Sequence, residues 1–154
     1  MWEIVGLGFD DPAARGLLSA ALAELVDRYG GGGDDTPLHA GEFDPPVGCF
    51  LVARVDGVPA GCGGWRTPAD GTSEVAEIKR MYTLPEWRCR GVAAALLRAL
   101  EDSARGAGRK RMALETGYKQ PEAIALYQKL GYEQIPNFGH YADNPLTVSF
   151  GRRL

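Results

Sequence analysis

The sequence predicts an α/β fold in which helices flank a mixed, mostly antiparallel sheet of about six to seven strands. Two turn signals, Asp56-Gly57 and Asp70-Gly71, separate apolar segments and indicate antiparallel hairpins. In the second half the pattern becomes strand, helix, strand, helix and strand, which favours a crossover connection and a partly parallel sheet. We expect residues 1–154 to form one domain, because this length supports a self-sufficient core.

The first half of the chain is predicted to contain one helix and several strands. Asp10-Asp11-Pro12 precedes an apolar stripe of helical period and indicates a capped helix start. The run from Gly30 to Gly33, followed by Asp34-Asp35-Thr36-Pro37, cannot continue that helix and predicts a flexible loop. The elements indicated by periodicity are a strand at 3–5, a helix from 12 to 29, and strands at 49–55, 59–66 and 74–83.

The second half is predicted to alternate helices and strands. From Gly91 the apolar residues recur with helical period, and Gly106 and Gly108 end that helix. Gly131 marks the end of a second helix as its C-terminal cap. The predicted elements here are a helix from 91 to about 105, a strand at 111–115, a helix at 121–130, and strands at 132–135 and 146–150.

Composition and charge exclude several classes of protein. Hydrophobic residues make up 45% of the chain and charged residues 24%, as in globular proteins. The net charge of −3 argues against nucleic acid or an anionic membrane as a partner. Three cysteines without a C-x-x-C pair, and only two histidines, favour neither a disulfide framework nor a metal site. Because the sequence shows no signal peptide and no long apolar segment, we expect a soluble, cytoplasmic protein.

The segment Arg88-Cys89-Arg90-Gly91-Val92-Ala93-Ala94 has the chemistry of an anion site. It joins a predicted strand end to a predicted helix start, where free backbone N–H groups and the positive end of the helix dipole coincide. Gly91 permits close approach of the backbone to a phosphate, and two arginines can add charge-assisted bonds. An ordinary loop with solvated arginines explains these residues equally well. Neither the P-loop pattern nor the dinucleotide fingerprint is present.

Two ordered motifs resemble those of the GNAT superfamily of acyl-CoA N-acyltransferases. Arg88, Gly91 and Ala93 match the pattern Q/R-x-x-G-x-G/A, between a strand and a helix as in that family. Downstream, the segment 120–132 resembles N-x-x-A-x-x-L-Y-x-K-x-G-F. The resemblance implies the GNAT fold, with a splayed parallel pair of strands at the cofactor site, and acetyl-CoA as cofactor.

The same resemblance implies which residues hold the cofactor. The pyrophosphate is expected on the backbone amides of the turn, and pantetheine beside the central strand. Gln120 stands where the family usually has asparagine, so an amide group is retained. The cofactor-binding residues implied are Met81, Tyr82, Thr83, Arg88, Cys89, Arg90, Gly91, Val92, Ala93, Ala94, Gln120 and Tyr127.

Acyl transfer to an amine needs a base for the ammonium and an acid for the leaving thiolate. By resemblance, Glu77 on the central strand is the candidate base and Tyr127 the candidate acid. Each has a structural alternative, because Glu77 can pair with a nearby cation and Tyr127 can pack as a helix aromatic. Glu115 is a second candidate base or an ammonium ligand. The loop before the last strand offers Tyr141 and His140 as substrate contacts.

The resulting functional hypothesis is an N-acetyltransferase that moves an acetyl group from acetyl-CoA to the primary amine of a small molecule or amino acid. Attack is expected to be direct, in a ternary complex without a metal, and the family suggests a possible homodimer. Transfer to protein N-termini or lysines is an alternative acceptor class. A non-catalytic acyl-CoA-binding module and a nucleotide-binding domain are alternatives from other functional classes.

Overall fold

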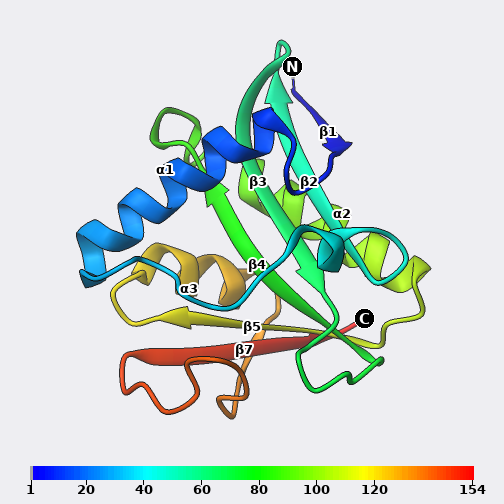
Figure 1. Cartoon of the computed structure of the whole chain (residues 1–154), viewed down its shortest axis with the longest axis vertical. Coiled ribbons are helices and arrows are strands. Elements are labelled where there is room, and N and C mark those ends of the chain that lie inside the picture. The colour runs from blue at the N-terminus through cyan, green and yellow to red at the C-terminus, as the bar shows by residue number, and fades with distance from the viewer. Residues whose placement is uncertain (1) are drawn as a thin grey trace.

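One sheet forms the centre of the molecule and carries helices on both faces (Figure 1). The computed structural model describes residues 2–154. The strands are β1 (Trp2–Gly6), β2 (Gly48–Val55), β3 (Val58–Arg66), β4 (Val75–Thr83), β5 (Arg111–Gly117), β6 (Glu133–Ile135) and β7 (Thr147–Arg153). The α-helices are α1 (Pro12–Tyr29), α2 (Val92–Gly106) and α3 (Pro121–Lys129).

The seven strands of the described residues follow the order β1-β2-β3-β4-β5-β7-β6. Only β4 and β5 are parallel, and every other neighbouring pair is antiparallel. The predicted mixed, mostly antiparallel sheet flanked by helices is therefore confirmed. The last strand in the sequence, β7, lies between β5 and β6, so β6 forms this edge of the sheet.

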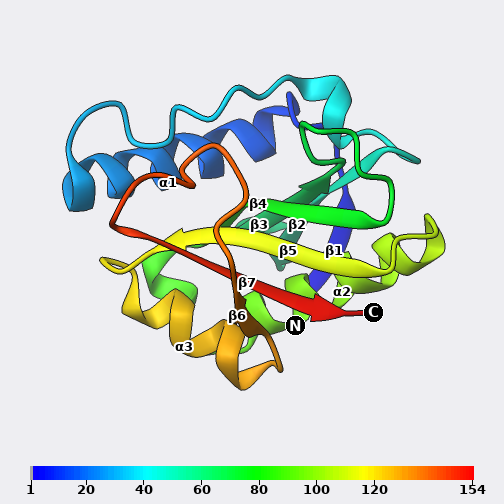
Figure 2. The same cartoon turned by 90° about the horizontal axis from the view of Figure 1, so that it is seen from below.

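The helices divide between the two faces of the sheet. In Figure 2, α1 lies on one side, while α2 and α3 lie on the other. The Asp11 carboxylate accepts a bond from the Ala13 N–H at 2.9 Å and caps α1, which ends at Gly30. Helix α1 buries Leu17 and Leu18 against the sheet, whereas α2 buries an apolar stripe that includes Leu100. Each face thus has its own apolar core.

The parallel pair separates part-way along its length. Pairing of β4 with β5 runs from Val75 opposite Arg111 to Glu77 opposite Ala113. Beyond this point β4 continues to Thr83 and β5 to Gly117, without further pairing between them. This divergence confirms the predicted splay. It leaves one edge of β4 without its strand partner at the end that faces the start of α2.

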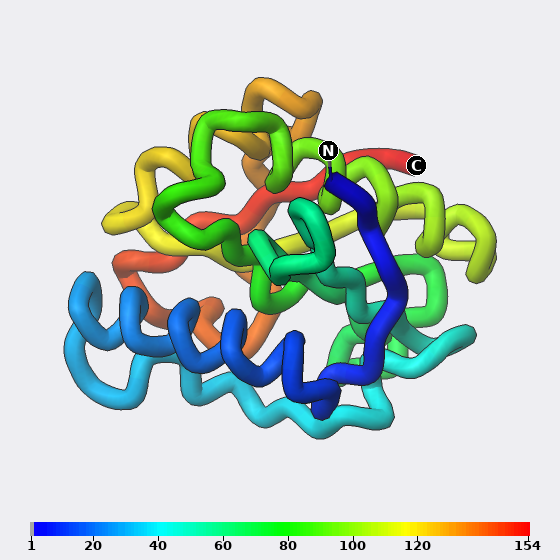
Figure 3. The backbone as a smooth tube through the Cα atoms, turned by 90° about the horizontal axis from the view of Figure 1, so that it is seen from above, coloured from blue at the N-terminus to red at the C-terminus, as the bar shows by residue number. Residues whose placement is uncertain are grey.

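Residues 30–37 form a loop as predicted, and two further features lie beyond the predicted elements. The predicted loop after α1 leads into a short 3₁₀ helix, η1 (Ala40–Phe43), whose Phe43 is buried against Phe50. Strand β7 extends to Arg153, beyond the predicted end at 150, because it pairs with β5 as far as Arg111. Figure 3 shows the segment after α1 returning alongside that helix.

None of the helices within residues 2–154 has both the length and the apolar character needed to cross a bilayer.

We predict that Leu100→Ala costs about 2–5 kcal/mol of unfolding free energy, because it opens a cavity in a core that the α2 side chains fill. Leu100 is 0% exposed. Urea denaturation followed by circular dichroism measures the change. Val58→Ala is the control, since Val58 is 59% exposed and its truncation should shift the free energy by less than about 0.5 kcal/mol. Equal costs for both variants would contradict the placement of this core.

Candidate active site

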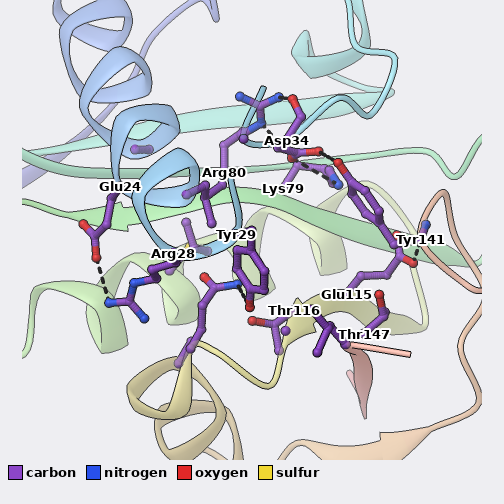
Figure 4. Close-up of a pocket in the computed structure, with 18 of the residues that line it drawn as sticks. Glu24, Arg28, Tyr29, Asp34, Lys79, Arg80, Glu115, Thr116, Tyr141 and Thr147 are labelled. Atoms are coloured by element: carbon purple, nitrogen blue, oxygen red, sulfur yellow. Dashed lines mark hydrogen bonds and ion pairs between the residues drawn. The ribbon is translucent and has the colours of Figure 1, made fainter. Parts of the chain in front are cut away.

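A cavity of about 400 Å³ opens where β4 and β5 separate. Its walls come from the last turns of α1, residues 30–35, β4, β5, α3 and the segment that leads into β7. Figure 4 shows charged side chains reaching it from several of these elements. The cavity therefore depends on the divergence of the two parallel strands, which leaves room that a paired sheet would fill.

The turn before α2 presents backbone N–H groups. Cys89 and Gly91 adopt left-handed conformations, with φ of 60° and 86°. Alternation of such conformations gathers successive N–H groups into a concave anion site. The first helical bond runs from the Ala95 N–H to the Gly91 carbonyl at 3.1 Å, so the N–H groups of 92–94 have no intrahelical acceptor. The turn therefore presents backbone N–H groups at the start of α2 that are available to an anion.

The arginine side chains of this turn are engaged elsewhere. Arg88 donates from Nε to the Thr83 carbonyl at 2.9 Å and from Nη2 to the Glu24 carboxylate at 2.5 Å. Arg90 stacks over the Trp87 ring, 5.1 Å from its centroid. The N–H groups of 92–94 are consequently the donors of this turn that have no intrahelical acceptor, and Arg88 ties the turn to α1.

The inner wall of the cavity is formed by Met81 and Tyr82 of β4 and by residues of α3. Gln120 donates from its amide to the Tyr29 hydroxyl at 3.4 Å, which links α3 to the end of α1. Tyr127 is 6% exposed and packs 5.8 Å from the Tyr132 ring, centroid to centroid. Burial raises the pKa of the Tyr127 phenol, which keeps it protonated at neutral pH. A protonated phenol in this position can donate a proton.

Glu77 belongs to a buried ion-pair network in which Arg66 binds the carboxylates of Glu77 and Glu42. It is 3% exposed and accepts a bond from Arg66 Nε at 3.0 Å. Arg66 also donates to the Glu42 carboxylate at 3.0 Å and to the Pro37 carbonyl at 2.9 Å. Glu77 is not among the residues that line the cavity. Its observed role is to hold Arg66 in a buried position.

Glu115, in contrast, lines the cavity from β5. Its Oε2 accepts a bond from the Tyr141 N–H at 3.1 Å, and its Oε1 is buried without a hydrogen-bond partner in the described chain. A side chain at Gly139 would collide with this carboxyl, so glycine permits the loop to close over it. Burial raises the pKa of Glu115, with the nearby Glu77 charge adding to the effect and the Lys79 charge opposing it.

A hydrogen-bonded contact joins the loop after α1 to the loop before β7. The Tyr141 hydroxyl lies 2.8 Å from Asp34 Oδ1 and 2.7 Å from Asp35 Oδ1, and it can donate its single proton to one of them. The Asp35 N–H donates to the same hydroxyl at 2.7 Å. His140 Nε2 lies 3.0 Å from Asp35 Oδ1 at the rim. We call this contact between Asp34, Asp35, His140 and Tyr141 the loop clasp.

Asp34 also connects the loop clasp to β4. Its Oδ2 lies 3.2 Å from Arg80 Nε and 3.8 Å from Lys79 Nζ, while Oδ1 accepts bonds from Thr36. Burial alone would raise the pKa of Asp34. The charges of Lys79 and Arg80 and the hydrogen bonds from Thr36 outweigh burial and lower this pKa to about 2. Asp34 is therefore ionised at any working pH.

Comparison with known proteins identifies the family. A profile of the "Acetyltransferase (GNAT) family" matches residues 15–132. This chain belongs to the GNAT acetyltransferase family. It is 40% identical over 139 residues to a protein named "IAA acetyltransferase" from Azospirillum brasilense, which covers 86% of this chain and 88% of that protein. The GNAT chain is thus an acyltransferase, as predicted.

Solved structures agree with this GNAT assignment. A putative acyl-CoA N-acyltransferase from Klebsiella pneumoniae aligns with a TM-score of 0.81 at 29% identity, over 100% of this chain and 98% of its own. A GNAT acetyltransferase from Elizabethkingia anophelis with acetyl-CoA bound has the same fold, with a TM-score of 0.69 at 21% identity over 99% and 98% of the two chains. Membership of the GNAT acetyltransferase family implies acetyl-CoA as the cofactor of this protein.

The GNAT structure brings part of the predicted site together. The predicted residues that line the cavity are Met81, Tyr82, Glu115, Gln120, Tyr127 and Tyr141. Those that lie outside it are Glu77, Thr83, His140 and residues 88–94 of the phosphate turn. Sequence reasoning did not assign site roles to Glu24, Asp34, Lys79 or Arg80. The available signal for Lys79 and Arg80 was their position, because they are two adjacent cations in the strand that precedes the turn at 88–94.

We predict that Asp34→Asn destabilises the protein by about 2 kcal/mol above pH 5, since the folded-state pKa lies well below the unfolded value. The contribution is fully present above the unfolded pKa of 3.8 and is lost as the pH falls towards about 2. Urea denaturation between pH 3 and pH 7 measures it.

Asp70→Asn is the matched control for this experiment. Asp70 accepts the same two local bonds from Thr72, at 2.9 and 2.7 Å, but is exposed. The difference between the variants therefore measures what Asp34 has beyond its local bonds, namely the two cations, its burial and the Tyr141 contact, and the part that depends on pH follows the ion pairs. A cost for Asp34→Asn that equals that of Asp70→Asn at every pH would contradict the ion-pair account.

Proposed function

We propose that this protein is an N-acetyltransferase that transfers an acetyl group from acetyl-CoA to the primary amine of a small molecule or amino acid. The observation that carries the proposal is the cavity at the splay, which has a carboxylate, Glu115, on one wall and a protonated phenol, Tyr127, on another. Acyl transfer to an amine needs a proton acceptor and a proton donor in one enclosed space. Direct transfer in a ternary complex needs no further nucleophile.

The chain's own groups suit the cofactor. The N–H groups of the turn at 88–94 are arranged to hold a pyrophosphate, and the unpaired edge of β4 offers backbone groups to an amide-containing chain such as pantetheine. Bound acetyl-CoA supplies an acetyl group activated as a thioester. Met81 and Tyr82 line the cavity beside that edge. They exclude water from the thioester end and strengthen the polar interactions there.

Two carboxylates compete for the role of base. Glu115 lines the cavity, and its Oε1 has no hydrogen-bond partner within residues 2–154. Glu77 is held by Arg66 and would reach an amine only through intervening water. A carboxyl with a raised pKa is also the stronger base once ionised. These observations favour Glu115, with Tyr127 as the group that returns a proton to the thiolate.

We predict that acetyl-CoA and CoA raise the melting temperature of the protein, whereas ATP does not. The reason is that acetyl-CoA and CoA carry a pantetheine chain, which can extend from the turn at 88–94 along β4, and ATP has no such chain. Gly91→Ala should weaken CoA binding about tenfold, since a Cβ at φ 86° strains the turn that gathers the amides. Gly108→Ala is the control: Gly108 has φ 79° and lies just beyond the other end of α2. Stabilisation by ATP alone would instead indicate a nucleotide-binding domain.

We predict that Glu115→Gln lowers kcat/KM by about 10²-fold and removes the rise in rate with pH, because the base acts only when ionised. In the native enzyme the rate should increase as the pH rises through the raised pKa of Glu115. Glu77→Gln should keep the rise in rate but move it to lower pH, because the Glu77 charge contributes to the raised pKa of Glu115. It should also lose stability, since buried Arg66 loses a charged partner.

Steady-state CoA release between pH 5 and 9, with urea denaturation of both variants, measures these effects. The reverse outcome, loss of the pH-dependent rise in Glu77→Gln alone, would assign the base to Glu77. Unchanged kinetics in both variants, with CoA still bound, would support a non-catalytic acyl-CoA-binding module.

A further inference from the structure

Lys79 and Arg80 both line the cavity, although neighbouring residues of a strand normally point to opposite faces. A β-bulge explains this arrangement. Gly64 pairs with Lys79 and Cys62 with Tyr82, so two residues of β4 face one residue of β3. Arg80 adopts a left-handed conformation with φ of 61°, which is costly for a residue other than glycine. The strand thus accepts backbone strain to direct two cations towards one side.

The two cations share a single carboxylate. Asp34 Oδ2 lies 3.2 Å from Arg80 Nε and 3.8 Å from Lys79 Nζ. Lys79 Nζ donates to Thr36 Oγ1 at 3.2 Å, and Arg80 Nε, although close to Asp34, forms no hydrogen bond in the described chain. The side chains of Lys79 and Arg80 are only 6% and 10% exposed. Two buried cations with one anion leave positive charge that a second anion would neutralise.

The opposite wall carries the complementary charge. Glu115 on β5 contacts the backbone of Tyr141, and its Oε1 is buried without a hydrogen-bond partner in the described chain. Figure 4 shows Lys79 and Glu115 approaching the cavity from the two separated strands. The cavity is therefore dipolar, with its positive side on β4 and its negative side on β5. A simple amine, which is a cation in water, would carry no group of its own that could pair with Lys79, whereas an acceptor that also bears an anion could contact both walls.

We propose that the acceptor is a primary amine that also carries a carboxylate, which Lys79 binds directly and Arg80 supports by its charge, with the amine directed to Glu115. This inference rests on the proposed N-acetyltransferase function and specifies its substrate class. The bulge that turns Arg80 towards Asp34 makes Lys79 and Arg80 determinants of specificity. Their roles are distinct from those of the groups that hold the cofactor.

The test compares matched acceptors in the native enzyme. Each amino acid of a panel is assayed beside its carboxamide, which removes the negative charge, and beside the decarboxylated amine. With CoA release as the signal, the carboxylate-bearing member should have a kcat/KM at least about tenfold higher, because a charge-assisted bond to Lys79 is lost in the other two. Equal or higher values for the carboxamides or plain amines would overturn the proposal.

Variants of Lys79 identify the group responsible. Lys79→Met should abolish the preference for the carboxylate, whereas Lys79→Arg should keep most of it, and the folded state of each is checked by urea denaturation. Lys110→Met is the control, since Lys110 is an exposed lysine paired with Glu74 outside the cavity. Retention of the preference in a folded Lys79→Met variant would overturn the assignment. The native comparison decides the substrate class even if that variant does not fold.

Failure of this inference is distinguishable from failure of the proposed function. Stabilisation by acetyl-CoA and release of CoA with carboxylate-free amines would preserve the acetyltransferase and refute only the carboxylate site. Binding of acetyl-CoA without reaction of any amine on the panel would also refute the proposed acceptor. Absence of any stabilisation by acetyl-CoA would refute the function itself.

Discussion

The separation of β4 from β5 is the constraint on which the rest of the site depends. The two strands pair only as far as Glu77 and Ala113, while β3 continues to pair with β4 up to Thr83. Strand β4 is therefore ordered by one neighbour and free along its other edge. Backbone groups left unpaired in a protein interior need partners, and a cofactor with amide groups can supply them. Without the divergence there would be neither a free edge nor a cavity.

Contacts between distant segments fix the two ends of this cavity. At the end proposed for the cofactor, Glu24 of α1 pairs with Arg88 of the turn before α2, and Arg28 pairs with Glu122 of α3. At the end proposed for the acceptor, the loop clasp joins the residues after α1 to the loop before β7 through Tyr141. Helix α1 and its following loop thus bridge both sides of the opening. The opening keeps its width because each side is tied to the same segment.

Charge within the cavity is arranged by backbone geometry as much as by residue type. A regular strand would direct Lys79 and Arg80 to opposite faces of the sheet, and only one of them could reach Asp34. The bulge at Arg80 places both near that carboxylate. The cost of one left-handed residue is balanced by the ion pairs that it makes possible. In the proposed site, specificity for an acceptor would follow from the spacing of two strands rather than from a loop.

The sequence by itself determined the helices and strands and the turn before α2, because their signals lie within a few residues of one another. Gly91 at a helix start and the Asp56-Gly57 hairpin are local features of this kind. Only the tertiary structure decided that Glu115, and not Glu77, lines the cavity, and that Arg88 turns to Glu24. It also decided the bulge and the insertion of β7 between β5 and β6. These features arise from pairing between segments distant in the chain, which leaves no periodic trace in the sequence.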